Sequence, residues 1–514
     1  MDILFSAIVG DLVSESASFV ISKCFQQQPG IDMTLQRLER VVMRVDTVVE
    51  EGEGRLITNQ GMLRQLKLLR QGMYRGHYIL DALRLRAIGE EEENDGGLSL
   101  SHSSSALYKF IPAKRLRFSR STGSGSCNTE AQLFGTNNNI QEELQRLIDT
   151  LEDTMAGMNE FLFLLESYRQ ILRQPYGAYL LLDNCMFGRQ MDRQRVLNFL
   201  LCSSATPDLA VLPLVGPIRV GKTTLVENVC KDESVRDRFS MILFFPEGCL
   251  RDEAVIDLKE NNINGLVRHQ NCSSQNRLLV IVEIAEDINQ GTWRRLKSSI
   301  TDMTPCGGSK IIITSRSNRI MSLGTTEALQ LDYLSQEAYW YFFKSLVFGS
   351  TNPDEEPKLA KMAMEIALEQ RQCFTSAHII ADILRDNFNA RFWRTVLHCV
   401  RAYIQTHLHM FEKHPNLRVR VDEPVYYWRM EKSRGYFLIS KYHQSDSSEE
   451  VPRISMRDIL LERGGTLPRG EFEAVAWSSR IPPYYNYTIS CKLQEPQLTV
   501  GRKKRLHQHE EHLI

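Results

Sequence analysis

The sequence has few of the features that mark secreted, zinc-binding or membrane-spanning proteins. Its 11 cysteines among 514 residues are odd in number and scattered, with no CxxC pair and no His/Cys ligand spacing, which argues against a disulfide framework and a zinc site. Reduced thiols fit an intracellular compartment. Near the N-terminus Asp11, Ser14 and Glu15 interrupt the apolar run well short of the roughly 18 residues that a spanning helix needs. No basic segment precedes that run, so we expect neither a signal peptide nor a transmembrane segment.

The sequence also lacks an excess of positive or negative charge. The chain has 62 Lys and Arg against 63 Asp and Glu, a formal net charge of −1, so its bulk charge attracts neither nucleic acid nor an anionic membrane. The hydrophobic fraction of 42% and the charged fraction of 24% are ordinary for globular proteins. At roughly 100 to 200 residues per domain, the length predicts about three domains. We expect a cytoplasmic protein, with a nuclear or membrane-peripheral location as the alternatives.

Four early segments carry apolar residues at helical spacing, and four such stripes can bury one another. Residues 1–165 therefore predict an antiparallel helical bundle, with four helices packed on other domains as the alternative. The stretch 90–130, rich in Glu, Gly and Ser, predicts a flexible loop within it. The stripes consist of Leu4, Ile8 and Leu12; Leu35, Leu38, Val42, Val45 and Val49; Leu66, Leu69 and Met73; and Leu144, Leu147, Leu151, Met158, Phe161 and Leu165.

From residue 209 short apolar runs alternate with helical ones, which indicates a parallel α/β sheet. Most of these runs are apolar without alternation, as expected for strands covered on both faces. Pro213 argues against full pairing of the first strand, because proline donates no ladder hydrogen bond. The predicted strands are residues 209–215, 241–245, 278–282 and 310–314.

A glycine-rich segment follows the first predicted strand and precedes a helical one, which is the context that a P-loop requires. Its glycines let backbone N–H groups turn towards phosphate oxygens, Lys222 reaches the terminal phosphates, and Thr223 offers its hydroxyl to Mg²⁺. A glycine-rich turn with a surface lysine is the alternative. The predicted nucleotide-binding residues of this segment are Gly216, Arg219, Val220, Gly221, Lys222, Thr223 and Thr224.

Two further strand ends carry candidates for the same site. Glu283 ends an apolar strand, and an acidic group in that place can hold Mg²⁺ together with Thr223; a charged residue that simply meets solvent is the alternative. Arg316 follows the strand at 310–314 and is a candidate for the terminal phosphate, with a solvated arginine as the alternative. These patterns predict no catalytic residue.

Together the patterns predict a multidomain protein with a P-loop NTPase α/β domain built on a parallel sheet. Helical segments follow this domain, and the tail turns to aromatic and proline-containing runs, which predict a small C-terminal α+β module. The predicted parts are a helical bundle at 1–165, a linker at 166–208, the P-loop nucleotide-binding domain at 209–350, a helical extension at 351–410 and the C-terminal module at 411–514.

Four motifs in this order resemble the NB-ARC domain of plant disease-resistance proteins: the P-loop, the acidic strand, and residues 308–316 and 331–343. Residues 187–190 are similar to the linker that packs against adenine and ribose in that family, and Tyr78-Ile79-Leu80-Asp81 resembles part of the third helix of its coiled-coil N-terminal domain. The resemblance covers roughly residues 1–400. It implies an ADP/ATP switch in plant defence that acts through protein contacts, and two more nucleotide-binding residues, Gly188 and Arg189. The apolar stripes of the N-terminal bundle predict that it binds protein partners or self-associates, and the near-zero net charge predicts no nucleic-acid partner.

The sequence also departs from the family pattern. Family members usually have two aspartates after the strand, the first ordering Mg²⁺ and the second positioning the hydrolytic water, and matching residues 278–281 to that strand puts Val282 first and Glu283 second. Cys373–Ala377 stand where a Gly-Leu-Pro-Leu segment touches the base, no Met-His-Asp triplet follows, and no leucine-rich repeat is visible after residue 411. We therefore expect a degenerate, adenine-nucleotide-binding defence protein that acts through protein contacts with weak or no ATP hydrolysis. An active P-loop ATPase and an interaction protein with a vestigial P-loop are the alternatives.

Overall fold

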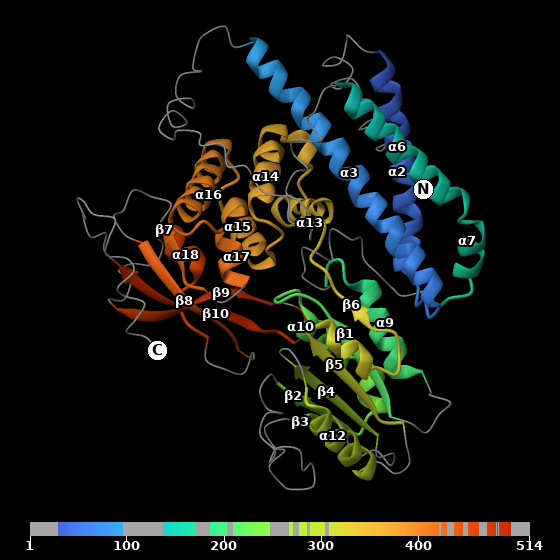
Figure 1. Cartoon of the computed structure of the whole chain (residues 1–514). Helices are drawn as coiled ribbons and strands as arrows, with labels where there is room; N and C mark the ends of the chain where they lie inside the picture. The colour runs from blue at the N-terminus through green and yellow to red at the C-terminus, as the bar shows by residue number, and fades with distance from the viewer. Residues whose placement is uncertain are drawn as a thin grey trace. The chain divides into compact units, whose positions relative to one another are not determined.

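The computed structural model of the chain is shown in Figure 1. It divides into two compact units. One consists of Met1–Pro175 with Glu337–Phe342 and Thr351–Lys361, and the other of Tyr176–Gln336 with Phe343–Ser350 and Met362–Ile514. The structure describes residues 29–95, 137–170, 186–202, 209–246, 267–270, 277–284, 288–303, 308–420, 423–428, 436–445, 451–461, 470–479, 481 and 483–494.

The first unit is built on long helices that bury the predicted apolar stripes. Its N-terminal helices are α2 (Pro29–Glu53), α3 (Gln60–Asp95), α6 (Asn137–Ala156) and α7 (Asn159–Leu165). Helices α2, α3 and α6 contact one another, and every residue of the three predicted stripes within 35–165 is buried. The remaining stripe, at residues 4–12, lies outside the described residues.

Helix α3 differs from the prediction at its C-terminal end. The helix continues to Asp95, six residues into the stretch 90–130 that was predicted to be a flexible loop. Residues 90–93 are four consecutive glutamates, and glutamate has a favourable helix propensity, so the helical pattern extends through them. The rest of that predicted loop lies outside the described residues.

The second unit contains a six-stranded sheet in the order β3-β2-β4-β5-β1-β6. Four of its strands coincide closely with the predicted runs, and β3 and β6 were not predicted. All neighbours are parallel except the pair β2 and β3. The strands are β1 (Ala210–Val215), β2 (Met241–Phe245), β3 (Val267–Gln270), β4 (Leu278–Ile284), β5 (Lys310–Ser315) and β6 (Leu329–Gln330).

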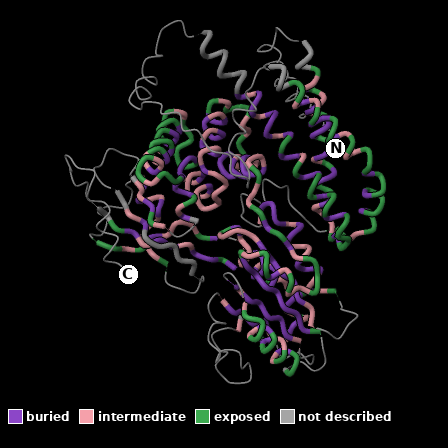
Figure 2. Tube along the Cα trace, in the orientation of Figure 1, coloured by how far each residue is buried: buried purple, intermediate pink, exposed green. Residues whose placement is uncertain are grey.

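Helices cover both faces of this sheet, which explains the unbroken apolar character of its central strands. One core joins the sheet to α9 (Gln190–Leu201), α10 (Lys222–Cys230) and α11 (Glu233–Arg238). The other joins it to α12 (Gln290–Met303) and the 3₁₀ helix η3 (Asn318–Leu323). Figure 2 shows the central strands as buried. The P-loop lies between β1 and α10, at the carboxyl edge of the sheet.

Pro213 does not interrupt the pairing of β1, contrary to the prediction. All six residues of β1 pair with β5, and Pro213 pairs with Ile313. The backbone of Val211 bonds Thr325 and that of Val215 bonds Leu331, so alternate residues including Pro213 direct their backbone nitrogens away from β5. On that side the proline ring packs against Gly324, where β6 has not yet begun. No ladder hydrogen bond to β5 is lost.

Helices and a second sheet follow the six-stranded sheet in the sequence. The helices are α13 (Gln336–Phe348), η4 (Pro353–Glu355), α14 (Pro357–Glu369), α15 (Phe374–Asp386), α16 (Ala390–Phe411), α17 (Pro415–Arg420) and α18 (Met456–Leu461). The second sheet is antiparallel in the order β7-β8-β10-β9, from β7 (Val425–Trp428), β8 (Tyr436–Ser445), β9 (Glu471–Ser478) and β10 (Asn486–Gln494). No helix within the described ranges is both long and apolar enough to cross a membrane.

Candidate nucleotide-binding site

The backbone of the predicted P-loop has the conformation that its glycines permit. The N–H of Gly216 donates to the carbonyl of Ser315 at 3.2 Å, which ties the start of the loop to the end of β5. A β-carbon on Gly216 would lie 2.3 Å from the carbonyl oxygen of Leu331, so the loop passes too close to that backbone for any side chain. Gly221 has φ +92° at the N-cap of α10, a left-handed conformation that glycine adopts without strain.

Lys222 is the first residue of α10, and its ammonium group lies inside the loop. Its Nζ donates to the carbonyls of Gly216 and Pro217, both at 2.8 Å. The positive end of the α10 dipole and the first N–H groups of the helix are at the same place. A helix N-terminus with a lysine beside it provides the charge and the donors that bind phosphate oxygens.

Thr223 and Glu283 meet at the edge of the sheet, where Thr223 donates its hydroxyl to a carboxylate oxygen of Glu283. The alternation along β4 explains which residue faces the loop. Leu279 and Ile281 point into the core on the α10 side, and Glu283 continues that face.

The match to the family strand had put Val282 at the metal position, but the residue that contacts Thr223 is Glu283. Val282 and Ile284 belong to the core on the α12 side of the sheet. The position next to the P-loop hydroxyl is therefore held by Glu283, and the residue that follows it is the apolar Ile284. No bulge is involved, because β4 and β5 pair without interruption from Leu279 to Ile284.

The two side chains fit a hard divalent cation. A hydroxyl and a carboxylate are the oxygen donors that Mg²⁺ prefers, and Mg²⁺ in such sites keeps water and phosphate oxygens as its other ligands. No group of three or more His, Cys, Asp or Glu that could hold a metal occurs in the part of the chain that the structure describes. Thr223 and Glu283 are therefore the protein ligands we consider, and the neighbouring Glu286 and Asp287 lie outside the described residues.

Gly188 and Arg189 lie beside the P-loop as parts of its support. Gly188 has φ +71°, and a β-carbon there would come 2.7 Å from the side chain of Leu334. The buried Arg189 guanidinium donates to the carbonyls of Asp332 and Val220 and lies 3.5 Å from the Asp192 carboxylate. The geometry of Arg189 thus ties the loop to the segment after β6.

Tyr333 also holds the loop, and the sequence analysis did not single it out as a site residue. Its hydroxyl donates to the carbonyl of Ile218 at 2.7 Å, next to Arg219, which has the unusual φ of +57° for a non-glycine residue. The signal was available, because Tyr333 belongs to the motif at residues 331–343. Arg316 follows β5 at the same edge and is exposed, in keeping with a candidate for the terminal phosphate.

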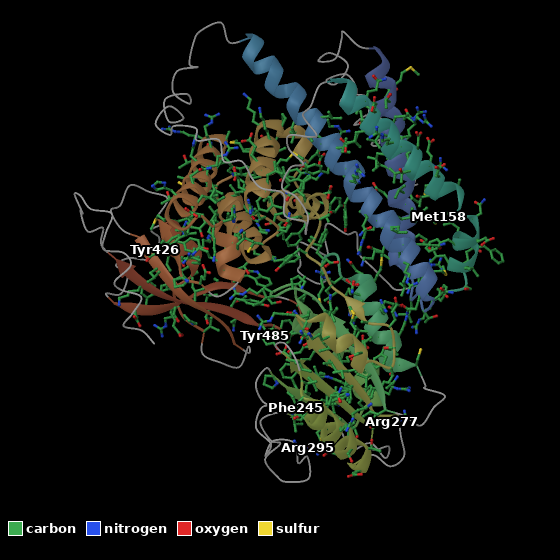
Figure 3. The ribbon with its side chains drawn as sticks, in the orientation of Figure 1. Met158, Phe245, Arg277, Arg295, Tyr426 and Tyr485 are labelled. Atoms are coloured by element: carbon green, nitrogen blue, oxygen red, sulfur yellow. The ribbon has the colours of Figure 1, made fainter. Side chains whose placement is uncertain are left out.

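Tyr485, just before β10, and Tyr487, within β10, contact α10, and nothing in the sequence pointed to them as site residues. The Tyr485 hydroxyl donates to the Glu227 carboxylate, a contact between groups 258 positions apart; Tyr485 is labelled in Figure 3. Tyr487 shares a hydrogen bond with Thr224. Burial and the Glu227 charge raise the pKa of the Cys230 thiol to about 12, so this thiol stays protonated and unreactive at neutral pH.

No protein-family model matches the chain. Among curated proteins it is similar to the putative disease resistance RPP13-like protein 1 of Arabidopsis thaliana, 23% identical over 383 residues, which are 71% of this chain and 34% of that protein. Disease resistance protein RGA2 of Solanum bulbocastanum is 21% identical over 382 residues, 71% of this chain and 36% of that protein. Putative disease resistance protein RGA1 of the same species is 24% identical over 245 residues, 44% of this chain and 24% of that protein.

The chain spans about a third of the length of the first two relatives. Among solved structures, a chain of the Drosophila ORC bound to DNA overlaps 45% of this chain and 68% of its own length, with a TM-score of 0.27 and 11% identity; this similarity is too low to carry an argument. The similarity to the first two of these disease-resistance proteins covers 71% of this chain. The chain is thus an NB-ARC-like relative of plant disease-resistance proteins.

Proposed function

We propose that this chain is a cytoplasmic, defence-related protein that binds ADP or ATP with Mg²⁺ and acts through contacts with other proteins, with slow or no ATP hydrolysis. The observation that carries the proposal is the arrangement of Lys222, Thr223 and Glu283 at the carboxyl edge of a parallel sheet. Ligands of open α/β sheets bind at this edge.

Each part of the loop has a role in this proposal. Backbone N–H groups between Gly216 and Thr224 surround the phosphates, and the Lys222 ammonium exchanges its two carbonyl contacts for phosphate oxygens. Thr223 and Glu283 hold Mg²⁺, which neutralises charge on the phosphate oxygens when bound. In this proposal Arg316, which is exposed after β5, contacts the terminal phosphate, and Arg189 supports the loop through the Val220 carbonyl.

Slow hydrolysis follows from the composition of β4. Glu283 is the only carboxylate in this strand, and its contact with Thr223 commits it to the metal side of the site. Hydrolysis needs a further group that orients the attacking water. The next residue, Ile284, is apolar and faces the opposite core, so β4 supplies no such group.

The nucleotide carried by the purified protein tests the binding proposal. Denatured protein should release ADP or ATP on chromatography, and Lys222→Ala should carry little of either. Removing the ammonium is expected to cost on the order of 2 to 4 kcal/mol, by analogy with the loss of one partner of a desolvated charge pair. Equal nucleotide content in both proteins would contradict the proposal.

Turnover separates this proposal from the active ATPase. We expect a steady-state rate well below about 1 s⁻¹, the lower end of ordinary enzyme rates. A rate at or above that value, abolished in Lys222→Ala, would favour the ATPase, with Glu286 or Asp287 as the water-positioning group. A vestigial P-loop would show itself differently, because added nucleotide would then leave the melting temperature unchanged.

Exposed apolar side chains in the first unit support the proposed protein contacts. Leu162, Phe163 and Leu164 are consecutive and exposed on α7, and the Phe163 side chain reaches 76% exposure. Contiguous exposed apolar groups are characteristic of interaction sites. Phe163→Ser should reduce self-association or partner capture by the full chain, as measured by light scattering and cross-linking. An unchanged mass and cross-linking pattern would exclude α7 from the contact.

A further inference from the structure

The turn between β9 and β10 reaches the phosphate-binding helix. The turn is closed by hydrogen bonds from the Ser479 N–H to the Tyr485 carbonyl and from the Tyr484 N–H to the Ile481 carbonyl, both at 2.8 Å. At its end the Tyr485 hydroxyl donates to the Glu227 carboxylate. Both side chains are buried, so the bond forms in a region where charge-assisted hydrogen bonds are strong.

Tyr487, the second residue of β10, makes a parallel contact one turn earlier in α10. It shares a hydrogen bond with Thr224, close to the charges of Arg219 and Glu227. Burial, followed by the Glu227 charge, raises the pKa of Tyr487 above its ordinary value, so the phenol is neutral at physiological pH.

The two contacts lie on one face of α10. Residues 224 and 227 are three positions apart and therefore neighbours on the helix surface. Lys222 and Thr223, in contrast, contact the P-loop carbonyls and Glu283. The helix that would bind phosphate with its N-terminus is thus held from its side by the C-terminal sheet.

A stack of three aromatic rings holds Tyr487 in place beside the β9–β10 turn. The Tyr487 ring stacks on Trp477 of β9, with centroids 5.3 Å apart and planes at 22°. Trp477 stacks in turn on His378 of α15, with centroids 4.3 Å apart and planes at 19°. Ring contacts of this kind add stability beyond the buried area, so the position of Tyr487 depends on both β9 and α15.

We propose that the β9–β10 turn, through Tyr485 and Tyr487, is a built-in brace on the phosphate-binding helix that sets how fast a bound adenine nucleotide leaves. The inference rests on the proposed nucleotide binding and adds a positioning role for two residues of the C-terminal sheet. Thr224 lies in the first turn of α10 and Glu227 in the next, so loss of either contact frees the part of the helix that would hold the phosphates. A less rigid site binds its ligand less well, because more order must be gained on binding.

The test measures the release of a fluorescent ADP analogue from the full chain after addition of excess ADP. Tyr485→Phe and Tyr487→Phe remove one hydroxyl each and keep the rings, and each should accelerate release about three- to ten-fold, the effect of losing one hydrogen bond of ordinary strength. Association should change less, because the open site is still present. Tyr484→Phe is the matched control, since Tyr484 lies in the same turn with its side chain 50% exposed.

Hydrogen exchange provides a second measurement that does not depend on the probe. Amides in the first two turns of α10 should exchange faster in Tyr485→Phe and Tyr487→Phe, and those of β4 should not. If the wild type binds the analogue but releases it no more slowly than either variant, the brace is overturned and the proposed function stays intact. Equal acceleration by Tyr484→Phe would overturn it too. Failure of the wild type to bind the analogue would overturn both proposals.

Discussion

The indole N–H of Trp340 donates to a carboxylate oxygen of Asp81 at 2.7 Å, across 259 positions of sequence. Asp81 lies on α3, and the Glu337–Phe342 part of α13 belongs to the same compact unit. Two segments that resembled family motifs for separate reasons therefore meet through one hydrogen bond. The Trp340 side chain is almost fully buried, so the bond satisfies an indole N–H that water does not reach.

Trp340→Phe should destabilise the first unit, because it keeps most of the ring but leaves the Asp81 carboxylate without the indole donor. The expected cost is about 1 to 3 kcal/mol, seen as faster hydrogen exchange in the middle of α3. Trp293→Phe is a suitable control, since Trp293 packs in the core on the α12 side of the other unit. Unchanged exchange in α3 would show that the bond adds nothing to stability.

Glu283→Gln should weaken the response to Mg²⁺ more than it weakens nucleotide binding itself. The amide keeps an acceptor for Thr223 but has no charge for the cation, so affinity in Mg²⁺ is expected to fall at least roughly ten- to hundred-fold, the range seen when a group that only supports a metal ligand is removed. Binding in EDTA should change little. Calorimetric titrations with and without Mg²⁺ measure both, and Glu233→Gln, on the exposed surface of α11, is the control. An equal loss under both conditions would contradict a metal role.

Gly216→Ala should distort the P-loop even though it adds only a methyl group. The new carbon would lie 2.3 Å from the Leu331 carbonyl oxygen, and a backbone atom cannot move aside as a flexible side chain can. We expect a loss of about 1 to 3 kcal/mol, as for overpacked cores, with weaker nucleotide binding. Gly291→Ala is the control, because its new carbon would meet only the Asn289 side chain, at 3.4 Å. Equal melting temperatures and affinities for both variants would refute the close approach.

Lys310 should make the second unit more stable as the pH rises. Its buried ammonium donates to the carbonyls of Phe199 and Cys202 at the end of α9, and burial, with the nearby Arg238 charge, lowers its pKa to about 8. Between pH 8 and the unfolded value of 10.5 the unfolded chain binds more protons, so stability increases with pH in this window.

The gain for Lys310 has an upper limit on the order of 3 kcal/mol, because the two carbonyl contacts of the ammonium offset part of its loss of water. Melting temperatures of the wild type and Lys310→Met, measured from pH 7 to 11, isolate this effect, because other titrating groups are common to both proteins. The wild type should gain on the variant only above about pH 8. A constant difference across the range would show that the buried lysine does not titrate there.

The parallel sheet and the P-loop could be predicted from the sequence because their signals are local. Strands covered on both faces are runs of apolar residues, and the observed β2 coincides with the predicted run. Composition alone could not predict which residue of β4 lies beside Thr223. Val282 and Glu283 are adjacent, and only the direction of the side chains along β4 shows that Glu283 faces α10.

Contacts between distant segments could not be predicted from one sequence. The bond between Tyr485 and Glu227 joins groups 258 positions apart, and a tyrosine before a strand carries no local mark of such a partner. The same limit applies to the strands β3 and β6. Strand β6 is two residues long, which is too short for any apolar pattern. The backbone of Leu331, which follows β6, nevertheless contacts the P-loop at Gly216.

The approach of Leu331 to Gly216 has a consequence for protein synthesis. The loop after β1 takes its shape from residues that the ribosome adds more than 100 positions later, through the Leu331 backbone and the Tyr333 hydroxyl. A nascent chain that has released β1 and α10 carries the P-loop residues without these supports. If the proposed function holds, the nucleotide binds only after translation has passed β6 and β1 has been enclosed between β5 and β6.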